Sequence, residues 1–295
     1  MKHFQGAWPA LVTPFTTQNQ VNLPVLRQLV DYLVGQGIGG LYVCGSTGEG
    51  VYMTVDERKA TLETVLEQVN GRIPTIAHVG ALVATDAMAL ARHAQEAGAD
   101  GFASIIPPLY GNTRSIIGYF TSLGAAAPEL PLFTYIFGGP VDAVALMRAM
   151  MEIPNLAGSK YTGPNMFEFR RIIELGAGKW TVFSGMDEQC LFAAMFGASG
   201  NIGSTLNYMA GLYREIHVAV NQGNFGRGTE LQLQANTITG IMIESGFMGA
   251  LKVVMTRLGF DCGAPRLPNL ALSQDDQQRL FSRLDAADFT ALTEI

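Results

Sequence analysis

The sequence has little charge of either sign and no long uninterrupted apolar run. Charged residues make up 15% of the 295 residues against 48% hydrophobic ones, and the formal net charge is −6. This balance excludes a chain kept disordered by charge. It also lacks the broad basic field that neutralises phosphates, so nucleic acid is not an expected partner. No apolar stretch reaches the roughly 18–20 residues of a spanning helix, so no membrane segment is expected.

Cysteine is scarce as well. Cys44, Cys190 and Cys262 are an odd number and form no Cys-x-x-Cys pair, which favours reduced thiols in a reducing compartment over a disulfide framework. The first apolar stretch contains Pro9 and Pro14 and lacks a small-residue cleavage pattern, so it is not expected to be a signal peptide. Together these features predict a cytoplasmic protein.

Glycine, with 34 residues, is the one amino acid in clear excess, and it stands between elements rather than in a repetitive tract. Glycine after a helix supplies the left-handed residue that turns the chain into the next strand. Short apolar runs typical of strands recur eight times, at residues 7–12, 40–44, 74–79, 101–106, 131–136, 156–160, 181–184 and 201–204. Helical spacing fills the intervals at residues 23–33, 55–69, 84–97, 115–125, 141–151 and 166–173.

This alternation predicts an α/β fold with a parallel sheet covered by helices. An eight-stranded closed (β/α)8 TIM barrel is the simplest assembly, and a doubly wound open sheet is the alternative. The stretch after residue 204 shows helical patterns and no further clear strand. We therefore expect a barrel catalytic domain over residues 1–225 and a C-terminal helical extension packed on it over residues 226–295.

In such a barrel the active site lies at the carboxyl ends of the strands. The second apolar run ends in Cys-Gly-Ser-Thr-Gly-Glu-Gly at residues 44–50. The hydroxyls of Ser46 and Thr47, with nearby backbone N–H groups, suit an anion. The loop lacks the Gly-Lys-Ser/Thr of a nucleotide-binding loop, so a carboxylate fits better than a triphosphate. The alternative is a plain tight turn capped by Glu49.

Lys160 is one of only five lysines and ends a run of apolar and small residues. Burial at the barrel mouth disfavours a charged ammonium. Only the neutral amine attacks a carbonyl, so this position is a candidate Schiff-base nucleophile. The alternative is a lysine that pairs with a carboxylate or extends to solvent.

Other polar side chains follow the remaining strands. Tyr135 ends the fifth run, where a phenol beside an amine acts as a general acid or base; the alternative is a core tyrosine bonded to backbone. Asp187 and Glu188 follow the seventh run, and Ser204 ends the eighth. The two acids suit a polyhydroxyl chain, and they also fit the first turn of a helix. The four histidines show no ligand spacing, so no metal site is expected.

Together these motifs resemble the N-acetylneuraminate lyase and dihydrodipicolinate synthase family of Schiff-base aldolases, over nearly the whole chain. Residues 45–49 resemble the family's carboxylate-binding loop, and Lys160, within Gly-Ser-Lys-Tyr-Thr, resembles its imine-forming lysine. Tyr135 occupies the place of its catalytic tyrosine. Residues 78–82, 185–189, 203–208 and 265–268 resemble the lyase branch of the family.

The resemblance implies that Ser46 and Thr47 hold a pyruvyl carboxylate while Tyr135 relays protons. Tyr110 resembles a tyrosine that family members offer across a subunit interface, and a homotetramer is implied. The implied contacts with the sugar portion are Thr162, Gly185, Asp187, Glu188 and Ser204. The implied activity is reversible cleavage of N-acetylneuraminate, a sialic acid, to pyruvate and N-acetylmannosamine without metal or cofactor, because the imine itself supplies the electron sink.

One departure bears on the substrate. The family usually shows Tyr-x-x-Pro after the fifth strand, whereas residues 135–140 read Tyr-Ile-Phe-Gly-Gly-Pro. Pro140 also stands where dihydrodipicolinate synthases typically carry an arginine for a second carboxylate, which argues against a dicarboxylate product. Two alternatives remain: a sister aldolase acting on another 2-keto-3-deoxy sugar acid, and a non-catalytic sugar-acid-binding protein on the same scaffold.

Overall fold

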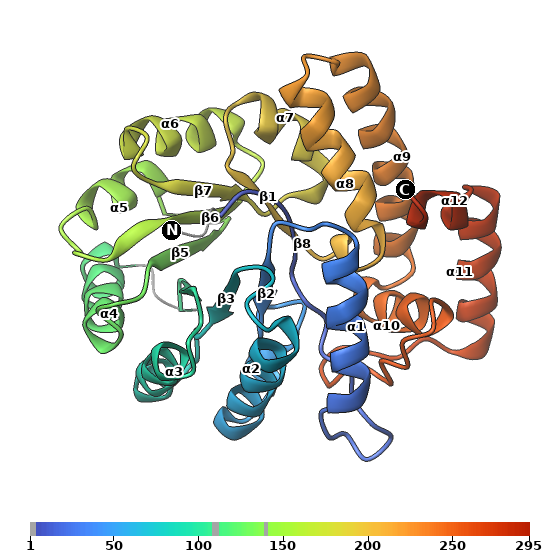
Figure 1. The fold of residues 1–295 in the computed structure, drawn as a ribbon, viewed down its shortest axis with the longest axis horizontal. Coiled ribbons are helices and arrows are strands. Elements are labelled where there is room, and N and C mark those ends of the chain that lie inside the picture. Colours follow the sequence, from blue (N-terminus) through green and yellow to red (C-terminus); the bar gives the residue numbers. More distant parts are fainter. Residues whose placement is uncertain (1–3, 108–111, 139–140) are drawn as a thin grey trace.

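The computed structural model describes residues 4–107, 112–138 and 141–295. Parallel strands alternate with helices around a common centre (Figure 1). The strands are β1 (Gly6–Pro9), β2 (Leu41–Val43), β3 (Thr75–His78), β4 (Gly101–Ile105), β5 (Leu132–Phe137), β6 (Leu156–Thr162), β7 (Thr181–Ser184) and β8 (Gly200–Gly203). The helices between and after them are α1 (Leu23–Gly35), α2 (Val55–Val69), α3 (Ala84–Glu96), α4 (Thr113–Ala126), α5 (Ala143–Ala149), α6 (Met166–Gly176), α7 (Cys190–Met195) and α8 (Leu206–Asn221).

The sheet runs in the order β1-β8-β7-β6-β5-β4-β3-β2, and a parallel bridge between Ala10 and Tyr42 joins its two ends. This closure confirms the TIM barrel and excludes the open sheet. It also explains why β1 is shorter than predicted. The Ala10 N–H still donates to Gly203 of β8 at 2.9 Å, whereas the next N–H, of Leu11, donates to Tyr42 at 2.9 Å. At Ala10 the chain therefore stops pairing with β8 and begins to pair with β2.

Other boundaries also differ from the sequence prediction, and two of them have a clear cause or consequence. Helix α5 begins at Ala143 rather than 141, because the Asp142 side chain accepts the N–H of Ala145 and caps the helix. Strand β6 continues to Thr162, two residues beyond the predicted end. Side chains alternate along a strand, so Lys160 and Thr162 lie on the same face.

The barrel has two hydrophobic cores. The larger fills the layer between strands and helices. The smaller lies inside the barrel and includes Trp8, Ile76 and Phe133. Two residues further along β3 and β5, on the same faces, come His78 and Tyr135. The apolar layer is thus followed, towards the carboxyl ends, by a layer that carries polar groups.

Further helices follow α8: α9 (Phe225–Glu244), α10 (Phe247–Arg257), α11 (Gln274–Ala286) and α12 (Phe289–Thr293). They gather on one side of the barrel, at the right of Figure 1. The predicted division at residues 225 and 226 falls at the start of α9 and stays a prediction. No single helix of the described residues is long and apolar enough to cross a membrane; α9 and α10 meet those criteria only as a pair, which is bent by 116°.

Candidate active site

A cavity of about 500 Å³ opens at the carboxyl ends of the strands. Its walls come from the ends of β5 to β8, the loop after β2 and helices α9 and α10. Tyr110, a predicted site residue, lies outside the described residues, as do Gly139 and Pro140 of the altered loop. The other predicted residues all line the cavity: Ser46, Thr47, Tyr135, Lys160, Thr162, Gly185, Asp187, Glu188 and Ser204.

Lys160 lies at the base of this cavity and is only 6% exposed. Tyr135 is its register partner on β5. The Lys160 Nζ lies 4.3 Å from the ring centroid of Tyr135 and 4.9 Å from that of Tyr42. Ring faces attract a nearby cation, so two aromatic rings locate the amine. Sequence reasoning missed Tyr42; alternation along the second run was the signal that places it inside the barrel.

Gly185, after β7, lies close against the lysine. A Cβ atom at Gly185 would come 1.8 Å from the Thr162 Oγ1 and 2.8 Å from the Lys160 Cε. Only glycine therefore allows the chain to pass at this distance. The Thr162 Oγ1 is buried and has no hydrogen-bond partner among the described residues. A buried hydroxyl without a partner is costly, so this atom is suited to a ligand group.

The loop after β2 is both a tight turn and an array of hydroxyls. The Glu49 N–H donates to the Ser46 carbonyl at 3.0 Å. The Thr47 Oγ1 lies 2.6 Å from the Ser204 Oγ at the end of β8. Hydroxyls from two strand ends are thus joined at the cavity wall. The turn and the hydroxyl site are compatible, but the Glu49 side chain does not cap the turn.

Glu49 instead turns into the protein, where its carboxylate is fully buried. Its Oε1 lies 3.0 Å from the Lys252 Nζ of α10, and its Oε2 accepts the Arg266 N–H at 2.7 Å. Lys252 also donates to the carbonyl of Thr13, whose hydroxyl donates to Gly48 at 2.7 Å. Burial lowers the pKa of Lys252, and the Glu49 carboxylate opposes that shift. The C-terminal helices therefore hold the loop from behind.

Asp187 is a buried carboxylate that lines the cavity after β7, in a short 3-10 helix, η2 (Asp187–Gln189), that precedes α7. Its Oδ2 accepts the N–H and hydroxyl of Thr205 at 3.0 and 2.7 Å. Its Oδ1 has no partner among the described residues. Burial raises the pKa of Asp187 to about 6, although the bonds from Thr205 oppose the shift. Asp187 thus lies at a helix start, as one interpretation predicts, and it lines the cavity, where its contact with a polyhydroxyl chain stays a prediction.

Replacing Asp187 by asparagine is expected to raise stability at neutral pH. The folded-state pKa of about 6 lies above the ordinary value of 3.8, so the folded state binds the extra proton and wild-type stability falls as pH rises from about 4 to 6. Because asparagine does not ionise, the variant should be more stable by about 1–3 kcal/mol at pH 7 and equal near pH 4. Urea unfolding across this range measures the difference; parallel curves for both proteins would contradict the expectation.

His78 is buried near the Lys160 amine, and hydrogen bonds occupy both nitrogens of its ring. Burial lowers its pKa well below the usual value, and the cations Arg58 and Lys160 lower it further. Its Nε2 accepts the Ile105 N–H at 3.1 Å, so its Nδ1–H faces the Cys44 carbonyl at 3.2 Å. Both ring nitrogens are used. No group of three or more potential metal-ligating side chains converges in the described part of the chain.

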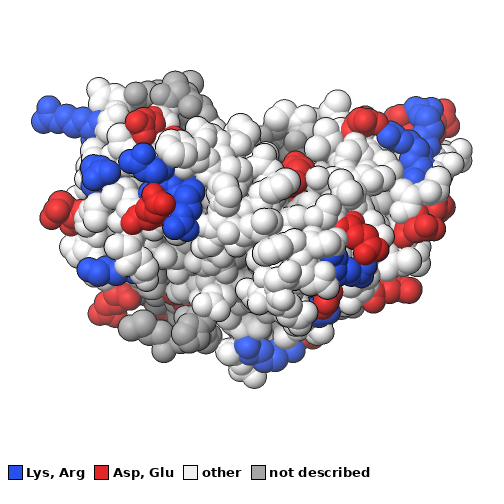
Figure 2. All heavy atoms as spheres, turned by 90° about the horizontal axis from the view of Figure 1, so that it is seen from above, with Lys and Arg blue, Asp and Glu red and all other residues white. Residues whose placement is uncertain are grey.

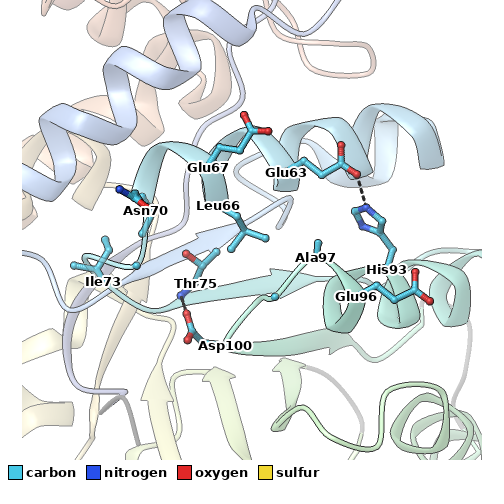
Figure 3. Close-up of a pocket in the computed structure, with 13 residues that line it drawn as sticks. Glu63, Leu66, Glu67, Asn70, Ile73, Thr75, His93, Glu96, Ala97 and Asp100 are labelled. Atoms are coloured by element: carbon cyan, nitrogen blue, oxygen red, sulfur yellow. Dashed lines mark hydrogen bonds and ion pairs between the residues drawn. The ribbon is translucent and has the colours of Figure 1, made fainter.

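A second cavity, of about 550 Å³, lies between α2 and α3 (Figure 3). Thr75 and Asp100, at the amino ends of β3 and β4, mark it as the opposite end of the barrel. Its polar side chains are partly paired: His93 with Glu63 at 2.7 Å, and Asp100 with the Thr75 N–H at 2.9 Å. The residues described as lining it include no lysine. Size therefore does not identify the active site; the buried amine does.

A buried lysine at the carboxyl end of a (β/α)8 barrel defines a class of protein suited to imine chemistry on carbonyl compounds. The chain belongs to the dihydrodipicolinate synthetase family, whose model matches residues 3–287. This confirms the resemblance inferred from the motifs.

Individual proteins of that family are similar to this chain over nearly its whole length. It is 32% identical over 300 residues to an N-acetylneuraminate lyase from Mus musculus, covering 98% of this chain and 94% of that one. An N-acetylneuraminate lyase structure from Proteus mirabilis superposes with a TM-score of 0.92 at 32% identity, over 97% of this chain and 99% of that one. A sialic acid aldolase from Aliivibrio salmonicida gives 0.93 at 30% identity, over 98% of both chains.

Proposed function

We propose that this protein is a Schiff-base aldolase, a carbon–carbon lyase, that reversibly cleaves N-acetylneuraminate to pyruvate and N-acetylmannosamine. The observation that carries the proposal is the buried Lys160 amine between two tyrosine rings, at the base of a cavity lined by hydroxyls and acids. The names of the relatives support this substrate. The activity places the enzyme in carbohydrate metabolism, in sialic acid catabolism.

The proposed chemistry needs only groups of this chain. The neutral Lys160 amine attacks the C2 ketone of the open-chain sugar acid, and loss of water gives a protonated imine. Ser46 and Thr47 hold the adjacent carboxylate. Tyr135 gives its phenol proton to the departing water and, as the phenolate, takes the proton of the C4 hydroxyl as the C3–C4 bond breaks. The bonding electrons pass to the imine to give an enamine. Protonation at C3 and hydrolysis then release pyruvate and free Lys160.

The sugar portion extends along the ends of β6 to β8. Thr162 and Asp187 each carry a buried oxygen without a partner among the residues described, and sugar hydroxyls would satisfy both. Gly185, Glu188 and Ser204 complete this proposed binding surface. Retention of Lys160 and Tyr135 together with Ser46, Thr47 and Thr162 favours catalysis over a binding protein that has lost turnover.

The test is borohydride trapping with N-acetylneuraminate, analysed by intact mass and peptide mapping, while pyruvate release is followed without reductant. A pyruvyl-sized adduct on Lys160 with release of pyruvate is expected. Trapping with pyruvate alone, without cleavage of the sugar acid, would support a sister aldolase. Binding of the sugar acid without adduct or pyruvate would support a binding protein.

We also propose a homotetramer, in which Tyr110, outside the described residues, reaches a neighbouring subunit. Exposed apolar side chains on the neighbouring helices α6 and α7 support an interface: Phe167, Phe192, Met195 and Phe196. Figure 2 views the molecule from the side of these helices and shows a broad central area with few charged side chains. Light scattering should give about four times the chain mass of 31.7 kDa; a monomer mass would contradict the proposal.

A cytoplasmic location is proposed as well. The three cysteines are free and buried, which suits a reducing compartment. Fractionation of the native host, followed by immunodetection, tests this proposal.

A further inference from the structure

The cavity between α2 and α3, at the amino ends of β3 and β4 (Figure 3), has a strongly acidic wall. Four of its lining side chains are carboxylic acids: Glu63, Glu67, Glu96 and Asp100. The residues described as lining it include neither lysine nor arginine. Glu67 pairs with Arg27 of α1 at 2.7 Å, but Glu96 has no ion-pair partner in the described part of the chain. The wall therefore keeps an excess of negative charge.

Two helices end at this cavity, and both carry an acid in the last turn. Helix α2 ends at Val69, and its last turn contains Glu67 but no basic residue. Helix α3 ends at Glu96 itself. The carboxyl end of a helix has a partial negative charge, which favours cations and disfavours acids. Arg72 donates to the Val69 carbonyl at 3.0 Å but does not line the cavity. The helix ends and the acids together favour a cation in this space.

Two buried atoms at the cavity that accept hydrogen bonds have no donor. Thr75 is fully buried, and its Oγ1 has no hydrogen-bond partner among the described residues. In Figure 3 its side chain points from β3 towards α2, into the space between them. Buried polar atoms without partners are costly. The Thr75 hydroxyl is therefore suited to an N–H group of a ligand.

The second acceptor is on His93. Its Nε2 lies 2.7 Å from the Glu63 carboxylate, and a carboxylate only accepts, so the Nε2 carries the hydrogen. In the neutral ring the Nδ1 is then an acceptor. The Nδ1 is buried and has no partner among the described residues. This side of the cavity thus offers a further contact for a donor.

The arrangement of these groups favours an extended organic cation over a metal ion. A metal ion needs several ligands around one point, and no group of three or more potential ligands converges in the described part of the chain. The volume of about 550 Å³ suits a small organic molecule. Leu66, Ile73 and Ala97 supply apolar surface to the same cavity, against which methylene groups bury favourably. A methylene chain with an ammonium at each end matches both the acids and the apolar surface.

We propose that this cavity is a binding site for an aliphatic diamine or polyamine. The ammonium groups lie at the carboxylates and at the Thr75 hydroxyl, and the methylene groups lie against Leu66 and Ile73. The site is at the end of the barrel opposite Lys160, so the inference does not depend on the proposed function. An amino acid would bring a carboxylate, for which the described walls offer no lysine or arginine, and should be rejected.

The test is isothermal titration calorimetry of the full chain at low salt with two ligands of equal carbon number. In 6-aminohexanoate a carboxylate replaces one ammonium of 1,6-diaminohexane. The diamine should bind with one molecule per chain, and 6-aminohexanoate at least about tenfold more weakly, because its carboxylate faces acids. Spermidine should bind like the diamine. Added sodium chloride should weaken diamine binding, since salt screens exposed charges.

Two variants and a matched control locate the site. Thr75→Val keeps the shape of the side chain and removes the hydroxyl, so the affinity for the diamine should fall about tenfold. Its free energy of unfolding should not fall, because the hydroxyl has no partner in the free protein. Glu96→Gln should weaken binding about two- to fivefold. Glu152→Gln changes the net charge equally at an exposed acid outside the cavity and should bind as the wild type does.

Each contrary outcome overturns the site. Absence of saturation up to about 10 mM diamine, or equal affinity for 6-aminohexanoate, would show that the cavity does not select an amine at both ends. Equal affinities in Glu96→Gln and Glu152→Gln would show that the diamine follows the overall charge and not this cavity. Because Glu96 is exposed, its variant keeps the test available even where Thr75→Val does not fold. Pyruvate release is measured separately, so failure of the aldolase proposal and failure of this site are distinguishable.

Discussion

Replacing Lys160 by methionine is expected to abolish imine formation and to lower kcat/KM on the order of 10⁴-fold or more. Methionine fills a similar volume between the rings of Tyr42 and Tyr135 but has no nucleophilic nitrogen. Because the imine is the only electron sink in the proposed mechanism, no other side chain replaces it. The measurements are the mass of the borohydride-trapped protein and the rate of pyruvate release.

Two further variants separate nucleophilic attack from charge. Lys160→Arg keeps a cation beside the rings but forms no imine, so it should be as inactive as the methionine variant. Lys179→Met removes an exposed lysine from the turn after α6 and should behave as wild type. A trapped adduct in Lys160→Met, or activity within tenfold of wild type, would disprove the assignment of this residue as nucleophile.

The second large effect is expected at the Glu49–Lys252 pair. Lys252→Met should lower the free energy of unfolding by about 3–5 kcal/mol, because it leaves the Glu49 carboxylate buried without its cation. Both side chains of the pair are fully buried, so water cannot replace the lost partner. Urea unfolding measures the loss. Lys252→Met should also raise KM for the sugar acid, because Glu49 no longer holds the Ser46–Thr47 loop.

The double variant Glu49→Gln with Lys252→Met tests this explanation. It removes both charges while the amide carbonyl of the introduced glutamine still accepts the Arg266 N–H, so most of the lost stability should return. Arg257→Met is the control on the same helix: its ion pair with Asp285 is partly exposed and should cost about 1 kcal/mol or less. A double variant no more stable than Lys252→Met would show that the single loss arises from packing and not from the unpaired charge.

The strand–helix order was predictable from the sequence because its signals are local. Apolar runs and glycine stops place β3, β4 and β7 within one or two residues of the predicted bounds. Errors arose where a hydrogen bond outside the apolar pattern set the boundary. Strand β1 ends when Ala10 changes its neighbour, and α5 starts late because the Asp142 side chain caps it. Neither of these two boundaries can be predicted from the spacing of apolar residues.

The sequence by itself brought Lys160, the hydroxyl loop and the acids to one site, because each lies at the end of a strand and all carboxyl ends meet at one face of a parallel barrel. Only the tertiary structure decided what surrounds them. Glu49 and Arg266 meet across 217 residues of chain, and Phe137 of β5 and Ile243 of α9 line the same cavity. Such contacts depend on closure of the barrel and on packing between elements that are distant in the sequence. The spacing of residues along the chain reports only on local structure.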